Sequence, residues 1–310
     1  MDGSSLSHHL SREVVWLAAQ MPFAQVSAAL ERLSQLSVPA TTVWRQVEQH
    51  GEHMQQQVEQ ERERVSVERT YWQHQKYAPQ ARLALAFDGG MVYIRGEGWK
   101  ELKVGTVGHI QRQWTASQQV IRLSQLHYVG VVGDVKAFKP ALWELAVHHD
   151  VPYAGHTVIT ADGAVWIWRL AADLFPCSVQ IVDWYHATQH LAQAVQARYR
   201  HDPTIAHHWL HQLKTYLYRG QIDQLVAELV AANLTDHTAY FRQHKRRMQY
   251  QAFWNAGYPI GSGAVESGVK QYKQRLAGPG MRWSRSGATR MVTLRSAVLS
   301  NTFDRLWRVA

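Results

Sequence analysis

Cysteine and long apolar segments are almost absent from this sequence. It has one cysteine in 310 residues and no apolar run near the roughly 18 residues that cross a bilayer. A lone Cys177 excludes an internal disulfide and a cysteine-based zinc site, and its segment "DLFPCSVQIV" predicts a small buried side chain rather than a nucleophile. The opening residues "MDGSSLSHHLSREVV" lack the basic and apolar parts of a signal peptide. We therefore expect a soluble, cytoplasmic protein without a membrane segment.

Acidic residues are scarce toward the C-terminus. Residues 1–80 hold nine of the 24 acidic side chains, whereas residues 237–310 hold only Glu266 and Asp304, and the formal net charge is +9. Because neutralising phosphates releases counterions, this balance favours DNA or another polyanion as a partner, although a solubility bias would explain the charge equally well. The cations between His237 and Phe303 are Arg242, Lys245, Arg246, Arg247, Lys270, Lys273, Arg275, Arg282, Arg285, Arg290 and Arg295.

The first 78 residues read as helices. The segments 23–36 and 39–51, joined by "SVPA", have the pattern of a helix-turn-helix, and a small helical bundle is the equally probable structure. Residues 52–75 are rich in Gln, Glu and Arg, which is typical of an exposed helical connector. We place a domain boundary near residue 78.

Strand patterns follow this boundary. The segments 82–90, 91–95, 99–110 and 125–134 predict antiparallel strands, and the order strand, helix, strand, helix between 156 and 199 predicts βα units. Together these patterns predict an α/β fold with a mixed sheet and flanking helices. Residues 200–257 carry almost no strand signal and predict an all-helical insertion. The predicted units are thus 1–50, 51–78, 79–199, 200–257 and 258–310.

Three carboxylates are candidates for a shared site. Asp88 in "AFDGG" and Asp162 in "TADGA" each close an apolar strand segment, and Glu266 follows a Gly-Ser-Gly turn at the start of a helix. Each acid also has a structural explanation, since Asp caps turns and helices and Glu is favoured in a first helical turn. Asp134, which ends another strand, is predicted to be structural.

Hard oxygen ligands of this kind suit Mg²⁺ or Mn²⁺. Two such ions held by few protein ligands can activate water or a 3′-hydroxyl and stabilise the leaving oxygen during phosphoryl displacement. We expect Asp88, Asp162 and Glu266 to hold a pair of ions, with the nearby cations binding DNA phosphate. The histidines His207 and His211, one helical turn apart, lack a third ligand nearby and are not expected to bind metal.

Four segments resemble bacterial insertion-sequence transposases of the ISKra type, which are relatives of the Mutator-like DDE transposases. They are "AFDGG", "ADGAVWIWRLAADLFPCSVQIVDWYHATQHL", "GSGAVESGVKQYKQRL" and "GPGMRWSRSGATRMVTLRS", and the resemblance covers roughly residues 20–308. It implies a ribonuclease-H-like core interrupted by a helical insertion, which agrees with the order of elements above. It also implies a transposase that cleaves transposon ends and transfers strands, acting as a homodimer or higher oligomer on DNA.

The resemblance assigns roles to individual residues. It makes Asp88, Asp162 and Glu266 the catalytic, metal-binding acids. Asp183 in "IVDWYH" is a rival for the second acid, and its position matches a Cys-to-His motif of Mutator-like relatives. Asp183, Trp184 and His186 are therefore expected to support the site or position DNA. The residues expected to contact DNA are Lys270, Lys273, Arg275, Arg282, Trp283 and Arg285, with Trp283 as the stacking residue.

Two other functions remain open. Transposases of this type usually carry more DNA-binding sequence ahead of the helix-turn-helix-like part, so a truncated or domesticated remnant that only binds DNA is the main alternative. A glycosidase using two of the carboxylates would fit the acids but not the basic C-terminal region.

Overall fold

The computed structural model describes residues 6–65, 78–115 and 119–309, so part of the predicted connector, residues 66–77, lies outside the described residues. Three helices precede the sheet: α1 (His8–Ala18), α2 (Phe23–Ser34) and α3 (Ala40–Arg64). Between α2 and α3 the chain turns at Gln35, whose φ of 55° is left-handed. Two helices joined by a tight turn were expected here. However, α3 is one helix of 25 residues that continues through the boundary predicted at residue 50.

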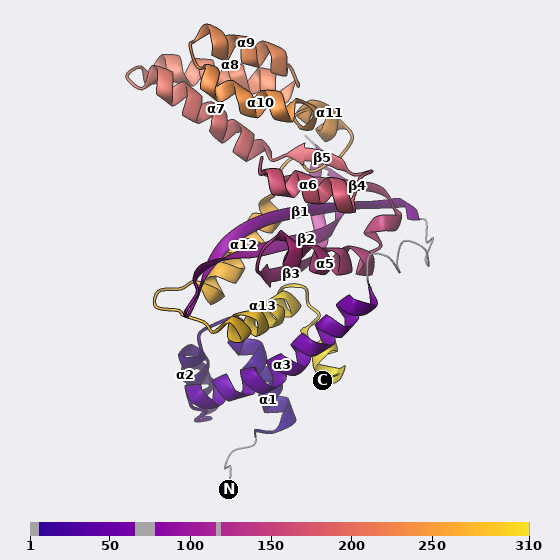
Figure 1. Ribbon diagram of the computed structural model, residues 1–310, viewed down its shortest axis with the longest axis vertical. Coiled ribbons are helices and arrows are strands. Elements are labelled where there is room, and N and C mark those ends of the chain that lie inside the picture. The colour runs from indigo at the N-terminus through magenta and orange to yellow at the C-terminus, as the bar shows by residue number, and fades with distance from the viewer. Residues whose placement is uncertain (1–5, 66–77, 116–118, 310) are drawn as a thin grey trace.

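A five-stranded mixed sheet forms the centre of the protein (Figure 1). Its strands are β1 (Ala78–Ile94), β2 (Gly98–Trp114), β3 (Gln119–Val132), β4 (Ala154–Ala161) and β5 (Val179–Val182). The order is β3-β2-β1-β4-β5, in which β1, β2 and β3 are antiparallel neighbours while β4 and β5 run parallel to β1. This is a ribonuclease-H-like sheet topology, as the sequence predicted.

The first strand differs from its prediction. The sequence indicated two strands, 82–90 and 91–95, with Asp88 at the end of the first, but β1 runs without a break from Ala78 to Ile94. Gly89 and Gly90 pair with Lys103 and Leu102 of β2, so the glycines lie within the ladder and form no turn. Asp88 therefore lies in the middle of a long strand.

Helices follow and cover the strands. They are α5 (Val135–His148), α6 (Val165–Leu174), α7 (Trp184–Tyr199), α8 (Pro203–Tyr218), α9 (Ile222–Ala231), α10 (Thr238–His244), α11 (Tyr250–Asn255), α12 (Gly263–Leu276), α13 (Arg285–Leu299) and α14 (Phe303–Val309). Single 3₁₀ turns lie at Val151–Tyr153, Thr235–His237 and Lys245–Arg247. No helix in the described part of the chain is long and apolar enough to cross a membrane.

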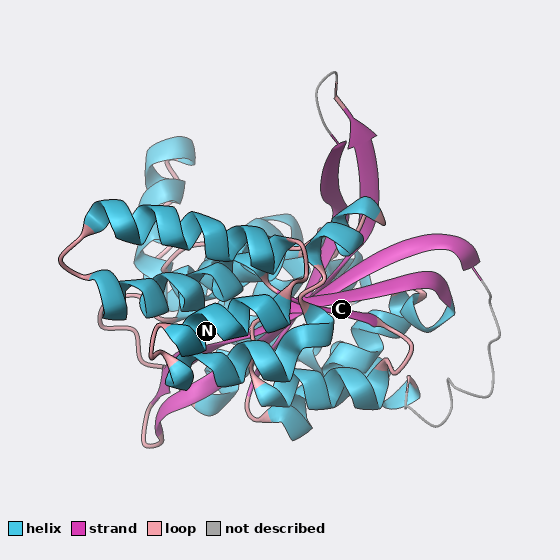
Figure 2. Ribbon diagram, turned by 90° about the horizontal axis from the view of Figure 1, so that it is seen from above, coloured by secondary structure: helices cyan, strands magenta, loops and turns pink. Residues whose placement is uncertain are grey.

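Two hydrophobic cores lie on opposite faces of the sheet. One contains Phe87, Phe138 and Ile167, packs α5 and α6 on the sheet and continues into the helices α7–α11. The other contains Val104, Val269 and the helices α12, α13 and α1–α3. Figure 1 accordingly shows α8–α11 at one end of the molecule and α1–α3 at the other. Figure 2 shows the far ends of β2 and β3 projecting beyond the helices.

Two sequence expectations about single residues have clear outcomes. Cys177 is exposed and not buried, because it lies in the turn between α6 and β5 that the Ser178 amide closes on the Phe175 carbonyl. Asp134 is structural, as predicted, since its carboxylate caps α5 by accepting from the Ala137 amide at 3.0 Å.

The basic C-terminal region holds the N-terminal helices to the core. Arg290 of α13 donates to Glu48 and Glu52 of α3, and the Arg295 guanidinium lies against the Ala19 carbonyl. Both arginines are only 7% exposed. Part of the positive charge of the C-terminal region is therefore offset within the chain, where Arg290 pairs with the acids of α3.

Arg275 is the most deeply buried of these cations. It is 2% exposed, its Nε donates to the Ala18 carbonyl at 2.6 Å, and its guanidinium lies 5.0 Å from the ring centroids of both Phe23 and Trp283. Burial lowers the pKa of Arg275 to about 10, so the group remains charged at neutral pH. The prediction that Arg275 contacts DNA does not fit this position.

We predict that Arg275→Ala lowers the free energy of unfolding by about 2–4 kcal/mol, because it removes a desolvated cation–π contact and leaves the Ala18 carbonyl unpaired. Urea unfolding at 25 °C measures this change. Lys270→Ala on the exposed face of the same helix is the control and should change stability by less than about 0.5 kcal/mol. An Arg275 variant with unchanged stability and weakened DNA binding would restore the original prediction.

Candidate functional site

The three predicted acids gather at one edge of the sheet. In the parallel pairing of β1 with β4, Leu85 lies opposite Ile159; three residues later in each segment, Asp88 lies within β1 and Asp162 directly follows β4. Glu266 approaches from α12, which packs against β1. The sheet register and the packing of one helix therefore bring together carboxylates that are 74 and 104 residues apart in sequence.

Asp88 shows the electrostatic cost of this arrangement. Burial raises the pKa of its carboxyl group, and the charges of Asp162 and Glu266 raise it further. The hydrogen bond from the Gly89 amide and the nearby His186 lower this pKa, but by less. The Gly89 amide donates to Asp88 Oδ1 at 2.6 Å. Three partly desolvated carboxylates that repel one another form a site that a cation would stabilise.

Asp162 follows the last residue of β4 and is held in an Asx turn. Its Oδ1 accepts from the Ala164 amide at 2.9 Å, which leads the chain into α6. The glycine between them is required by a close approach, because a Cβ atom on Gly163 would lie 2.4 Å from Cε2 of Tyr240. Asp162 is therefore fixed both by its own turn and by the helical insertion that packs on that turn.

The insertion contributes aromatic residues beside the acids. The Tyr240 ring of α10 stacks on His190 with a centroid distance of 3.9 Å, and its buried hydroxyl has no hydrogen-bond partner among the described residues. Burial and the charges of Asp162 and Asp183 raise the pKa of Tyr240, so its hydroxyl stays protonated at neutral pH. Nothing in the sequence singled out Tyr240, because only packing brings α10 to this edge of the sheet.

Asp183 is buried and anchors the neighbouring elements. It follows β5 directly, is 0% exposed, and caps α7 by accepting from the His186 amide at 2.9 Å. Its other oxygen accepts from the Ser262 amide at 2.5 Å and the Ser262 hydroxyl at 2.9 Å. Both oxygens of Asp183 thus fix α7 and the start of α12, and its role in supporting the site or positioning DNA stays a prediction.

Ser262 links Asp183 to the third acid, Glu266. Its hydroxyl lies 2.9 Å from Asp183 Oδ2 and 3.1 Å from Glu266 Oε1, and its single proton can satisfy only one of them at a time. Ser262 is the N-cap residue of α12, yet its hydroxyl caps no helix amide and turns to the acids. The sequence drew attention to the Gly-Ser-Gly turn but did not identify this role of the serine.

Two further bonds hold the strand-like segment before α12 against the sheet. The Thr160 hydroxyl donates to the Pro259 carbonyl at 3.1 Å, and the Trp184 amide donates to the Ile260 carbonyl at 2.9 Å. The Trp184 ring points the other way and packs edge-on against Tyr250 of the insertion at 4.9 Å. Trp184 thus joins the core, the insertion and the segment that leads to Glu266.

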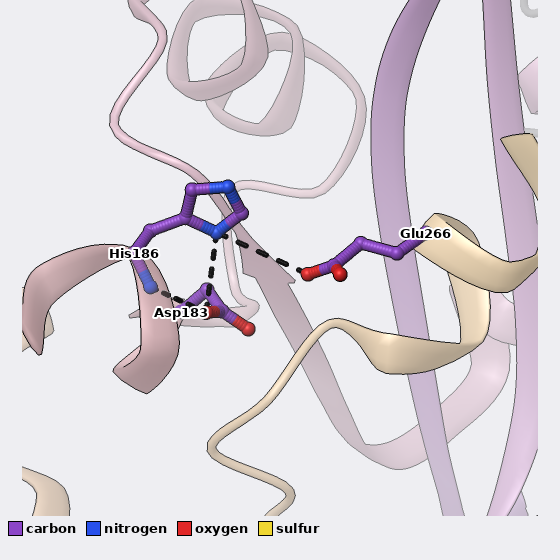
Figure 3. Close-up of side chains that lie close together, drawn as sticks. All are labelled: Asp183, His186 and Glu266. Atoms are coloured by element: carbon purple, nitrogen blue, oxygen red, sulfur yellow. Dashed lines mark hydrogen bonds and ion pairs between the residues drawn. The ribbon is translucent and has the colours of Figure 1, made fainter. Parts of the chain in front are cut away.

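His186 completes the tightest group of ligand-type side chains. Its Nδ1 lies 3.2 Å from Asp183 Oδ1 and 4.0 Å from Glu266 Oε1 (Figure 3). Among the described residues, Asp183, His186 and Glu266 are the only three whose potential ligand atoms all lie within 4.8 Å of one another. Because the Asp183 carboxylate accepts from Nδ1–H, the Nε2 atom of a neutral His186 keeps a free lone pair.

The predicted metal trio is more open than this group. Asp88, Asp162 and Glu266 interact electrostatically, but their oxygens do not meet the same 4.8 Å limit. A pair of ions about 3.5–4 Å apart is compatible with such a wider set of ligands, whereas the group around His186 is held together by the bond from Nδ1–H to Asp183. Glu266 belongs to both groups, so it lies where the two possible sites meet.

The predicted DNA-contacting residues divide into two sets. Lys270, Lys273 and Arg282 are exposed, and the Lys273 stem lies against β1 near Gly90, two residues from Asp88. Trp283 is partly buried and donates from Nε1 to the Leu276 carbonyl at 2.8 Å.

The second set makes contacts within the protein and consists of Arg275, Trp283 and Arg285. Arg285 is paired with Glu97 and donates to the Val132 carbonyl. The stacking role predicted for Trp283 therefore does not match its packing.

We expect Asp88→Asn to stabilise the metal-free protein at neutral pH. Since the folded-state pKa of Asp88 lies above its ordinary value of 3.8, the native state binds the extra proton, and stability falls as the pH rises between those two values. The asparagine variant should lack this fall. Thermal unfolding from pH 4 to 8 without divalent cations measures it, with exposed Asp236→Asn as the control; identical profiles for wild type and Asp88→Asn would contradict the repulsion.

Asp183→Ala should destabilise the protein by about 2–4 kcal/mol, because it removes a helix cap and leaves the buried Ser262 amide unpaired. Asp134→Ala is the matched control, since it removes an exposed N-cap without long-range bonds and should cost only about 1 kcal/mol. Denaturant unfolding compares the two. Equal losses would show that the bonds from Asp183 to Ser262 contribute nothing.

Comparison with known proteins adds no name to this site. No protein-family model matches the chain, and no curated protein matches it. The structure itself shows a mixed five-stranded sheet of ribonuclease-H-like topology, flanked by helices, with Asp183, His186 and Glu266 close together beside it.

Proposed function

We propose that this chain is a DNA transposase that cleaves and joins DNA strands with divalent cations held by Asp88, Asp162 and Glu266. The observation that carries the proposal is the approach of Asp162, at the carboxyl end of β4, and Glu266 of α12 to Asp88 of β1 in a ribonuclease-H-like sheet, where their charges raise the pKa of Asp88. The resemblance of the sequence to insertion-sequence transposases supports the same conclusion.

The donor set fits Mg²⁺ or Mn²⁺. The trio offers only carboxylate oxygens, which these hard cations prefer, and the raised pKa of Asp88 is a penalty that a bound cation would remove. Two such ions would supply an activated water or 3′-hydroxyl and a stabilised leaving oxygen. The His186 imidazole lies beside Glu266, but the nitrogen nearest to it, Nδ1, donates its hydrogen to Asp183, so the trio itself would supply the ligands.

The remaining residues have roles in support and binding. Asp183 and Ser262 fix the start of α12 and thereby the position of Glu266. Lys270 and Lys273 follow Glu266 by one and two helical turns, so their exposed ammonium groups lie on the same side of α12 as the acid. They would hold the phosphates of a DNA strand that enters the site, without reading its sequence.

Glu266→Gln tests the proposal on supercoiled plasmid with Mg²⁺ or Mn²⁺. We expect wild-type protein to nick the plasmid, and the variant to do so about 1000-fold more slowly or worse, a scale known for loss of one charge-stabilising group. DNA affinity, measured with Ca²⁺ in place of Mg²⁺, should stay within about threefold, because the glutamine keeps the shape of the side chain.

Glu59→Gln, an exposed change on α3, is the control and should nick like wild type. A Glu266→Gln variant that retains full metal-dependent nicking would refute the assignment of the third acid. Wild-type protein that binds DNA but never nicks it would instead identify a DNA-binding remnant.

A further inference from the structure

The far half of the β1–β2 ribbon has one bare face. Beyond Asp88, Met91 pairs with Glu101 and Tyr93 pairs with Trp99. The opposite face of the ribbon is buried against α12 and its neighbours through residues such as Val92, Ile94 and Leu102, all 0% exposed. On the bare face, in contrast, Met91 is 41% and Trp99 is 60% exposed. In Figure 1 the ribbon extends past the other strands to the loop between α12 and α13.

The covering helices end just before this face. Leu142 and Phe138 of α5 fill the space over Gly105, and the Trp166 ring of α6 lies 4.0 Å from the Lys103 ammonium. Past Lys103, the residues on this side of the ribbon, Met91, Tyr93 and Trp99, are exposed or partly exposed. Exposing a large apolar indole to water is unfavourable in free energy, and the tryptophans buried in the two cores avoid this cost.

Aromatic rings and a cation are grouped on the bare face. The rings of Tyr93 and Trp99 meet edge-on with centroids 5.7 Å apart. The Arg282 guanidinium carbon lies 5.8 Å from the Tyr93 ring centroid, and Arg282 itself is exposed. An exposed indole beside a second ring and an arginine is the kind of arrangement on which nucleobases stack.

The local charge favours an anionic partner. Glu97 is paired with Arg285 and Lys100, and Glu101 is paired with Lys103. Arg95 and Arg282 form no ion pair with any described carboxylate. The two acids of the ribbon are thus neutralised, and two exposed cations beside the rings remain for phosphate.

The platform lies on the same strand as one of the acids. Tyr93 is five residues from Asp88 along β1, which is about 17 Å at the rise of an extended chain. Because side chains alternate along a strand, Asp88 lies on the face of β1 that Lys273 and α12 cover, whereas Tyr93 lies on the other face. A DNA strand engaged at the acids would reach the rings by passing beside β1 beyond Leu85, its last residue that pairs with β4.

We propose that Trp99, Tyr93 and Arg282 form a stacking platform for unpaired bases of DNA whose backbone is engaged at the acidic site. The identity of this partner rests on the proposed function. The platform takes bases of any sequence, because every base offers a π face, and it distinguishes unpaired from paired DNA, since bases inside a duplex are already stacked. It also replaces Trp283 as the base-stacking tryptophan of the chain.

The test uses two DNA probes in Ca²⁺, so that binding is measured without cleavage. One is a blunt duplex and the other is the same duplex with a short single-stranded extension carrying 2-aminopurine. We expect Trp99→Ala to weaken binding of the extended probe by about 5- to 100-fold and to abolish quenching of 2-aminopurine, while binding of the blunt duplex stays the same. Trp99→Phe should restore part of both signals.

Trp114→Ala is the matched control. Trp114 lies at the opposite end of β2 and is 72% exposed, so its loss removes a similar area of exposed ring far from the platform and should leave both signals unchanged. Equal effects of the two alanine variants, or no difference between the probes, would overturn the platform. A Trp99→Ala change that converts a dimer into a monomer with unchanged DNA binding would show that the face binds a second copy of the chain, which also overturns it.

These outcomes separate the platform from the proposed catalysis. A chain that nicks DNA with metal, but whose binding of the extended probe does not depend on Trp99, would defeat the platform alone. Trp99-dependent binding of the extended probe by a protein that never nicks DNA would leave the platform standing and defeat the proposed catalysis. A wild-type chain that binds neither probe would contradict both.

Discussion

The buried carboxylate of Asp183 joins parts of the chain that are nearly 80 residues apart. It ends β5, caps α7 and accepts both polar hydrogens of Ser262, so it fixes the start of α12 against the sheet. Glu266 stands one turn into that helix and shares the Ser262 hydroxyl with Asp183. A buried charge of this kind is tolerated only when it is fully hydrogen-bonded, and these bonds are what place the third acid beside the other two.

Two structural layers support this anchor from opposite sides. On one side the insertion packs Tyr240 onto the Asp162 turn and Tyr250 onto Trp184 at the start of α7. On the other side α12 carries Arg275 into the N-terminal helices, where Phe23 encloses the guanidinium. The helix that holds Glu266 is therefore stabilised along its whole length, as expected for a scaffold that must hold a catalytic group in one position.

The cations of the C-terminal region serve two purposes. Arg275 and Arg290 are buried and pair with carbonyl or carboxylate groups of the N-terminal helices, whereas Lys270 and Lys273 remain exposed beside the acids. Net charge cannot distinguish these purposes, because a paired and an unpaired arginine count alike. Only the exposed subset is free to neutralise phosphate, so any DNA-binding surface is narrower than the charge of the sequence implies.

The sequence by itself determined the order of the elements and indicated candidate acids. Hydrophobic periodicity predicted the mixed sheet and the helical insertion, and strand-ending carboxylates indicated Asp88 and Asp162, because these are local patterns. The tertiary structure decided what no local pattern encodes. It carried β1 through Asp88, brought Ser262 and Tyr240 to the acids, buried Arg275 and left Trp99 exposed, since each of these depends on contacts between residues far apart in the chain.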